Sequence, residues 1–214
     1  MQKAGRLVKS LLVLFMFLLA GLLFFRFWLN GFYPGAVRRT LPTEPLLAAY
    51  AEAGELAARR QEIRVSYDDP NEGLFFANHM MLVPDTGSLQ VTVRWNSSTL
   101  DRLAAEYGEA FDKEAEAPFT YRLFAATDKG EEIVLSGKTE IRGSSYLPVA
   151  RERASFAMYR YERLAFEGLD FEGVSWIRLE ISHAASETYE SDILIYENHE
   201  EYNEFEDFTI KELS

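Results

Sequence analysis

The stretch SLQVTVRWN, residues 88–96, indicates the fold class because its apolar and polar residues alternate without interruption. The apolar set is Leu89, Val91, Val93 and Trp95, and the polar set is Gln90, Thr92, Arg94 and Asn96. Successive side chains of a β-strand point to opposite faces of the sheet. The pattern therefore predicts a strand with one face toward a core and one toward solvent.

The same two-residue period recurs in FTYRLFAAT, residues 119–127, and in SWIRLEISH, residues 175–183. Further strand candidates are 62–67, 74–83, 132–141, 154–166 and 191–197. Strands with one polar face each are typical of antiparallel rather than parallel sheets. The sequence predicts an antiparallel β-sandwich or jelly roll over residues 62–198.

Two segments have helical spacing instead. In SSTLDRLAAEYGEAF, residues 97–111, apolar residues recur every three or four positions, which predicts a peripheral helix over an open end or edge of the sandwich. A second amphipathic helix is predicted over 46–61, where Thr43 precedes Glu44 and Pro45 in a helix-start pattern. This helix is expected to pack against the β domain, with pairing to a partner helix as the alternative.

The amino-terminal region is strongly apolar. Residues 11–29 number nineteen and would form a helix of roughly 28 Å, enough to cross the hydrocarbon core of a membrane. Residues 7–29 are thus predicted to be a single-pass signal-anchor, because bulky residues stand where a cleavage site would need small ones. The side chains assigned to the anchor are Leu11, Phe15, Leu19, Leu23, Arg26 and Trp28.

The distribution of charge predicts the orientation of this anchor. Residues 1–39 hold six bases and no acid, while residues 40–214 hold 16 bases and all 34 acids, a net charge of −18. A basic flank stays in the cytoplasm, so residues 1–6 are expected there, with 30–45 as a linker to an extracytoplasmic domain. The acidic domain argues against a nucleic-acid partner. The chain has no cysteine, so any exported domain folds without disulfides.

Catalytic sequence signatures are absent, and the three histidines are far apart in the sequence. No cofactor is predicted, with calcium as the one alternative. That alternative depends on the turn YDDPNEG, which supplies oxygen ligands from Asp68, Asp69, Asn71 and Glu72. Aspartate, asparagine, proline and glycine are also the ordinary residues of a tight turn.

The best binding candidate is RERASFAMYRYER, residues 151–163, where arginines surround two tyrosines in an otherwise acidic domain. Alternation places Tyr159, Tyr161 and Arg163 on one strand face and Arg160 on the other. Aromatic rings and guanidinium groups on an open sheet face could stack against and hydrogen-bond a glycan or a peptide. Cross-strand ion pairs with neighbouring acids would explain the same arginines.

The carboxyl-terminal residues 199–214 mix aromatic and acidic residues and are expected to dock on the domain or to bind a partner. Three functional hypotheses follow. The first is a membrane-anchored, non-catalytic module that binds an envelope protein or polysaccharide. The others are an envelope hydrolase or calcium-dependent module using clustered carboxylates, and a scaffold or oligomer held together by the helix at 46–61.

Overall fold

The structure is a computed structural model of the chain, which divides into two units, residues 1–38 and 39–214. It describes residues 2–31, 39–63, 74–127, 131–135, 138–142, 144–156, 159–183, 189–197 and 205–213.

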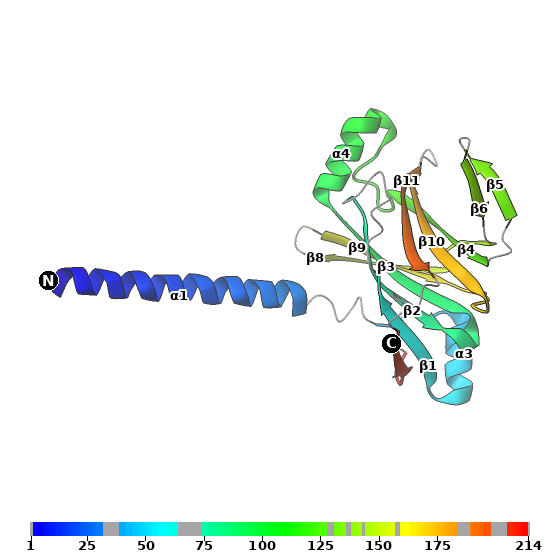
Figure 1. The fold of residues 1–214 in the computed structure, drawn as a ribbon, viewed down its shortest axis with the longest axis horizontal. Helices are drawn as coiled ribbons and strands as arrows, with labels where there is room; N and C mark the ends of the chain where they lie inside the picture. Colours follow the sequence, from blue (N-terminus) through cyan, green and yellow to red (C-terminus); the bar gives the residue numbers. More distant parts are fainter. Residues whose placement is uncertain are drawn as a thin grey trace. The chain divides into compact units, whose positions relative to one another are not determined.

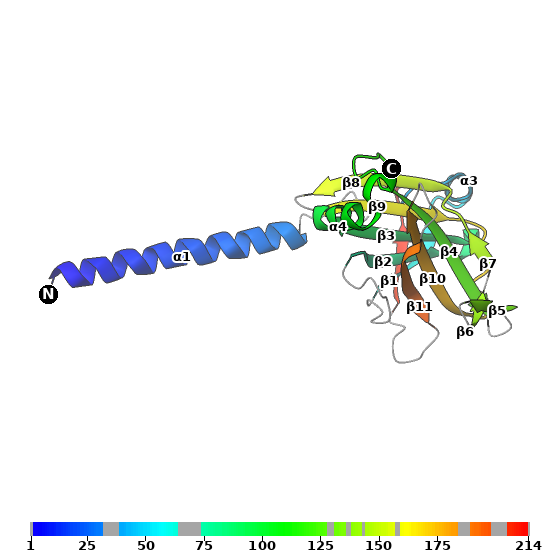
Figure 2. The ribbon, with the colours of Figure 1, turned by 90° about the horizontal axis from the view of Figure 1, so that it is seen from above.

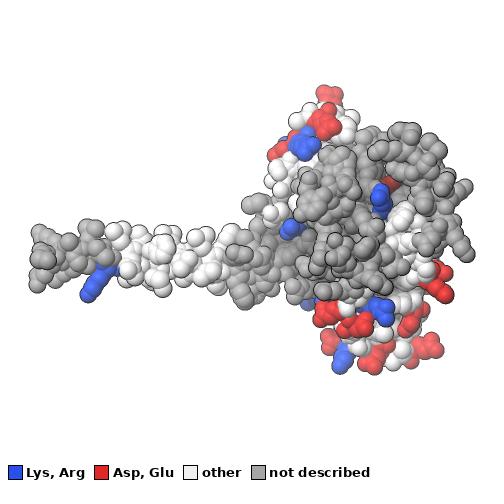
Figure 3. Space-filling model, in the orientation of Figure 1, with Lys and Arg blue, Asp and Glu red and all other residues white. Residues whose placement is uncertain are grey.

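The first unit is one long helix, α1 (Gln2–Gly31), whose side chains are described from Lys9 to Phe25. Its apolar side chains lie in the open, with exposed fractions between 41% for Leu19 and 74% for Phe17. Beyond Lys9, Figure 3 shows its described surface as uncharged. Among the residues that the structure describes, no helix has the combined length and apolar character of a membrane span.

The second unit is built from antiparallel sheets with a few helices (Figures 1 and 2). In spatial order, the six-stranded sheet comprises β12 (Glu206–Ile210), β1 (Leu56–Glu62), β2 (Phe76–Val83), β3 (Ser88–Asn96), β9 (Tyr159–Phe166) and β8 (Ala150–Phe156). The four-stranded sheet comprises β11 (Tyr189–Glu197), β10 (Val174–His183), β4 (Phe119–Thr127) and β7 (Ser144–Tyr146). A separate hairpin joins β5 (Glu131–Leu135) and β6 (Lys138–Arg142). The mainly antiparallel, sandwich-like fold predicted from the sequence is confirmed.

One core joins the facing sides of the two larger sheets. The predicted apolar face of β3 is buried along its whole length, with Trp95, the most exposed of the four, only 4% exposed. From the other sheet, Tyr121 and Leu123 of β4 and Leu179 of β10 enter the same cluster. Alternation therefore identified the core face correctly.

The outer face of β3 differs from the prediction because it is covered. Gln90 and Thr92 are 6% and 5% exposed. The carboxamide of Gln90 accepts from the backbone N–H of Leu41 and donates to the Leu41 carbonyl, both at 2.7 Å. Residues 39–43 thus lie on the sheet, and the prediction of a linker that extends to residue 45 is wrong for this part. Gln90 can be buried because its carboxamide forms hydrogen bonds with both the N–H and the carbonyl group of Leu41.

The helix predicted over 46–61 is shorter in the structure and begins two residues earlier. Helix α3 (Glu44–Ala53) begins after Thr43 as expected but ends at Gly54, which has a left-handed φ of 77° and donates to the carbonyl of Tyr50. Strand β1 follows at once, so the β domain begins before residue 62. Leu46 is fully buried in a small cluster with residues of β1, β2 and β12, so α3 packs against its own sheet. Figure 3 shows acidic side chains around α3.

Three other predicted segments can be compared with the strands of the structure. The candidates 132–141 and 154–166 each correspond to two antiparallel strands, β5 with β6 and the end of β8 with β9. In the carboxyl-terminal segment, β12 pairs with β1 from Ile210 opposite Leu56 to Glu206 opposite Arg60. This part docks on the domain as expected, as the outermost strand of the larger sheet.

The turn after the 3-10 helix η1 (Pro84–Thr86) provides a test of the fold. Gly87 has a φ of 62°, and a Cβ there would lie 2.7 Å from the carbonyl oxygen of Leu169. Gly87→Ala is expected to lower the free energy of unfolding by at least about 2 kcal/mol, because a left-handed conformation and a backbone clash add together. Gly54→Ala is the matched control, since Gly54 also has positive φ but open space around its Cβ position. Urea denaturation giving equal losses for both variants would contradict the close approach at Gly87.

Candidate functional site

One end of the sandwich is covered by α4 (Ser97–Tyr107) and the following 3-10 helix η2 (Gly108–Ala110). The helix starts directly from β3, with the side chain of Asn96 accepting from the backbone N–H of Thr99 at 3.0 Å. Leu103 and Phe111 are buried in the core, which confirms a peripheral helix over this end. Loop residues 112–118 then lead back into β4.

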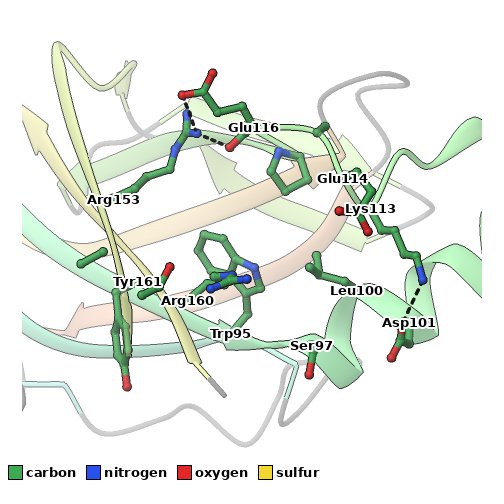
Figure 4. A pocket seen from close by; sticks show the side chains of 14 residues that line it. Trp95, Ser97, Leu100, Asp101, Lys113, Glu114, Glu116, Arg153, Arg160 and Tyr161 are labelled. Carbon is green, nitrogen blue, oxygen red and sulfur yellow. Dashed lines mark hydrogen bonds and ion pairs between the residues drawn. The ribbon is translucent and has the colours of Figure 1, made fainter. Parts of the chain in front are cut away.

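A cavity of about 360 Å³ lies between the larger sheet and this cover, and we refer to it as the end pocket (Figure 4). Its floor is one cross-strand row: Trp95 of β3 lies opposite Arg160 of β9, and Arg160 lies opposite Ser155 of β8. Its wall includes Ser97 and Leu100 of α4 together with residues of the 112–118 loop. The pocket thus combines three strands, one helix and one loop that are far apart in the sequence.

Six charged residues line the end pocket, and four of them form two ion pairs. Lys113 lies 3.5 Å from Asp101, and Arg153 lies 3.5 Å from Glu116. The remaining two charges, Arg160 and Glu114, have no side-chain partner among the residues that the structure describes. One unpaired charge of each sign is therefore available to a ligand.

Trp95 adds a buried hydrogen-bond donor to the same site. Its ring packs edge-on against Phe119 at 5.2 Å and tilted against Phe75 at 6.4 Å. The indole N–H is buried and has no acceptor within the described part of the chain. A buried donor without a partner costs roughly 1–3 kcal/mol, which an incoming acceptor would recover.

The comparisons with known proteins provide no family. No family model matches this chain, and no curated protein or solved structure shows significant similarity to it. The chemistry of the pocket is therefore the evidence for function.

A buried polar network lies next to the end pocket and supports its floor. Glu162 is fully buried; it accepts from the hydroxyl of Tyr121 at 2.9 Å and lies 3.7 Å and 3.4 Å from the Nε atoms of Arg151 and Arg153. Burial, together with the charge of Glu162 and its hydrogen bond, raises the pKa of Tyr121 well above its ordinary value, so this hydroxyl stays a donor. The network holds β8, β9 and β4 together and keeps Arg153 beside the pocket.

The predicted open binding face is wrong, because two of its members are buried. Tyr161 and Arg163 are 3% and 6% exposed. The side chain of Arg163 donates to Glu152, and burial followed by the charge of Arg39 lowers its pKa. Tyr159 instead makes a cation–π contact with Arg94, whose guanidinium carbon lies 5.3 Å from the centroid of the tyrosine ring.

Two of the four predicted residues nevertheless reach the end pocket. Arg160 contributes to its floor and Tyr161 to its lining. Trp95, Glu114 and the α4 contribution were not found from the sequence, because strand register and the fold of the 112–118 loop bring them together. An isolated tryptophan on a core face did not indicate that it would line a pocket.

The proposed calcium ligands Asp68, Asp69, Asn71 and Glu72 lie outside the described residues, so this prediction stays untested. Within the described ranges, no group of three or more histidine and acidic side chains is arranged to hold a metal ion. The anchor side chains of Arg26 and Trp28 also lie outside the described set.

His183 provides a pH test of how α4 and η2 cover the sandwich end. It is 2% exposed, and its ring lies 5.9 Å from that of Tyr107 and 4.8 Å from that of Phe111. Burial lowers the pKa of His183 below 6.5, so the unfolded chain binds a proton at higher pH than the folded one. The free energy of unfolding is therefore unaffected by the titration of His183 above about pH 7.5, and it decreases as the pH falls through about 6.5. The decrease is at most about 1.4 kcal/mol per pH unit for one proton.

Urea denaturation of the wild type and His183→Gln between pH 5.5 and 8 measures this contribution. The variant should lose stability less steeply with falling pH than the wild type. Equal slopes would show that the histidine ring is accessible to protons in the folded state.

Proposed function

We propose that this chain is a non-catalytic binding module that receives its ligand in the end pocket. The observation that carries the proposal is the cross-strand row of Trp95 and Arg160, which offers a buried N–H and an unpaired guanidinium on one floor. Figure 4 draws the two side chains next to each other, with Leu100, Glu114 and Arg153 around the same space. Mixed apolar and precisely placed polar groups are characteristic of sites that recognise small ligands or chain ends.

The pairing of the other lining charges favours binding over chemistry. Asp101 and Glu116 are each held by a cation, and no pair of free carboxylates lines the pocket within the described residues. The ligand would belong to an envelope protein or polysaccharide if the chain is anchored as proposed below. A cavity of this size accommodates a small residue or sugar unit rather than a folded surface.

A pocket-filling variant tests this function. Ligand-observed NMR with amino acids, short peptides, monosaccharides and disaccharides would be run on the full chain in detergent, and then on Ala115→Trp. Ala115 lines the end pocket, so the tryptophan should weaken binding of a detected ligand by about tenfold or more. Ala110→Trp is the matched control because Ala110 is exposed on the neighbouring η2 and outside the lining. Binding that survives Ala115→Trp unchanged, or no binding by any probe at millimolar concentration, would contradict the proposal.

We also propose that α1 places this module on a membrane as a single-pass anchor, with the acidic domain on the extracytoplasmic side. Support comes from the exposed apolar side chains along its described part, including Leu11, Phe15, Leu19 and Leu23. In water this apolar surface would be unfavourable at roughly 25 cal/mol per Å². The basic residues in the amino-terminal part of α1, Lys3, Arg6 and Lys9, and the acidic composition after the helix support the orientation.

Fractionation tests the placement independently of the ligand. The full chain is expected to stay in membranes after alkaline carbonate extraction, and external protease should digest the domain in intact cells. A variant that interrupts the apolar surface of α1, made by Phe15→Lys together with Leu19→Lys, should be released. Release of the wild-type chain by carbonate, or protection of its domain from protease, would overturn the anchor or its orientation.

A further inference from the structure

The unpaired charges of the end pocket identify a ligand class, and this step depends on the proposed binding function. We propose that the ligand is a zwitterionic amino acid or short peptide, whose carboxylate binds Arg160 and Trp95 and whose ammonium group binds Glu114. The donors of the floor, the charge balance and the apolar lining each support this ligand class.

The floor is suited to a carboxylate. A guanidinium presents a planar fork of N–H donors that matches the two oxygens of a carboxylate. Arg160 has no partner among the described residues, and the buried N–H of Trp95 belongs to the residue directly opposite it on β3. Both donors therefore come from residues that lie opposite each other on one strand pair.

The charge balance of the lining argues against a strongly anionic ligand. Three acids and three bases line the pocket, and two of each are already paired. A dianionic phosphate would gain one unpaired cation but would approach the unpaired Glu114. A ligand with one charge of each sign satisfies both Arg160 and Glu114.

The rest of the lining fits the body of a small peptide. Leu100 and Pro118 provide apolar contacts, while Ser97 and Ser155 carry hydroxyl groups that can donate or accept. The two serines can hydrogen-bond a peptide group, and the apolar pair can cover a small side chain. Carboxylate, peptide unit and ammonium group would thus each meet a suitable part of the wall.

The test uses alanine, dialanine and trialanine as probes of the full chain in detergent, with binding measured by calorimetry or ligand-observed NMR. Each added residue lengthens the separation of the charged ends by up to about 3.5 Å, so the series scans the distance from Arg160 to Glu114. For the member that binds best, amidation of the carboxylate should weaken binding by about tenfold or more, and so should acetylation of the amine.

Variants assign each charged end to its residue. In Arg160→Gln the peptide and its amide should bind equally weakly, and in Glu114→Gln the peptide and its acetylated form should do so. Trp95→Phe keeps the aromatic packing but removes the N–H, so a loss of about threefold to tenfold is expected. Arg102→Gln, an exposed change on α4 outside the pocket, is the matched control and should bind like the wild type.

The outcomes separate the two proposals. If none of the three probes binds, or if the amide binds the wild type as well as the free acid does, the zwitterion proposal is overturned. If a neutral saccharide then binds and Ala115→Trp blocks it, the binding function stands without this ligand class. If no probe of any class is blocked by Ala115→Trp, both proposals fail.

Discussion

Glu162→Ala is expected to lower the free energy of unfolding by about 3 kcal/mol. Glu162 is fully buried and lies between the guanidinium groups of Arg151 and Arg153, while its carboxylate accepts from Tyr121. Removing it leaves a buried hydroxyl without an acceptor and two partly buried cations without their common partner. The loss is measured by urea denaturation followed by circular dichroism.

Two variants show whether the charge or the hydrogen bond dominates. Glu162→Gln keeps an acceptor for Tyr121 but removes the negative charge, so its loss should be intermediate. Asp207→Asn removes an ion pair with Arg59 in which both side chains are more than half exposed, and it should cost less than about 1 kcal/mol. A loss at Glu162→Ala as small as that at Asp207→Asn would show that the buried network contributes little to stability.

Phe119→Ala should lower the free energy of unfolding by about 4 kcal/mol. Phe119 is fully buried at the start of β4 and makes edge-on contacts with Phe75 at 4.9 Å and Trp95 at 5.2 Å. Truncation would remove the apolar contacts of a complete ring and leave a cavity between the two sheets. The strands around this cavity are fixed by pairing within their own sheets, so they cannot move in to fill it. Because Trp95 rests on this ring, ligand binding in the end pocket should weaken as well.

Phe208→Ala in β12 is the control with the same chemical change. Phe208 is half-buried at the edge of the larger sheet, where its ring lies under the guanidinium of Arg60 at 4.6 Å. It should cost about 1–2 kcal/mol, because the site can collapse and solvent already reaches it. Equal losses for the two variants would contradict the assignment of Phe119 to the rigid centre of the core.

Much of the end pocket could not be predicted from the sequence, although two of its lining residues, Arg160 and Tyr161, were among the predicted binding residues. Arg160 was predicted to lie on the opposite side of its strand from Tyr161 and Arg163, and in β9 it does, on the same face as Trp95 of β3. The alternation was right, but burial of the outer face could not be deduced from β9 itself. That face is covered partly by residues 39–43, which the sequence placed in a linker.

The sequence by itself determined the class of fold, because a two-residue period is a local property of the chain. Alternation in SLQVTVRWN specifies which side chains can enter a core before any partner strand is known. The helical spacing after Asn96 likewise predicts α4, and its amphipathic face needs an apolar surface to cover.

Only the tertiary structure decided which strands are neighbours, where a continuous pattern divides into two strands and which polar faces are covered. Gln90 binds the backbone of Leu41, and strand register places Trp95 opposite Arg160. These are contacts between residues far apart in the chain, whose energies depend on the final packing. The physical reason is that a local pattern fixes the direction of a side chain relative to its own strand, whereas a pocket requires several strands to adopt one particular register.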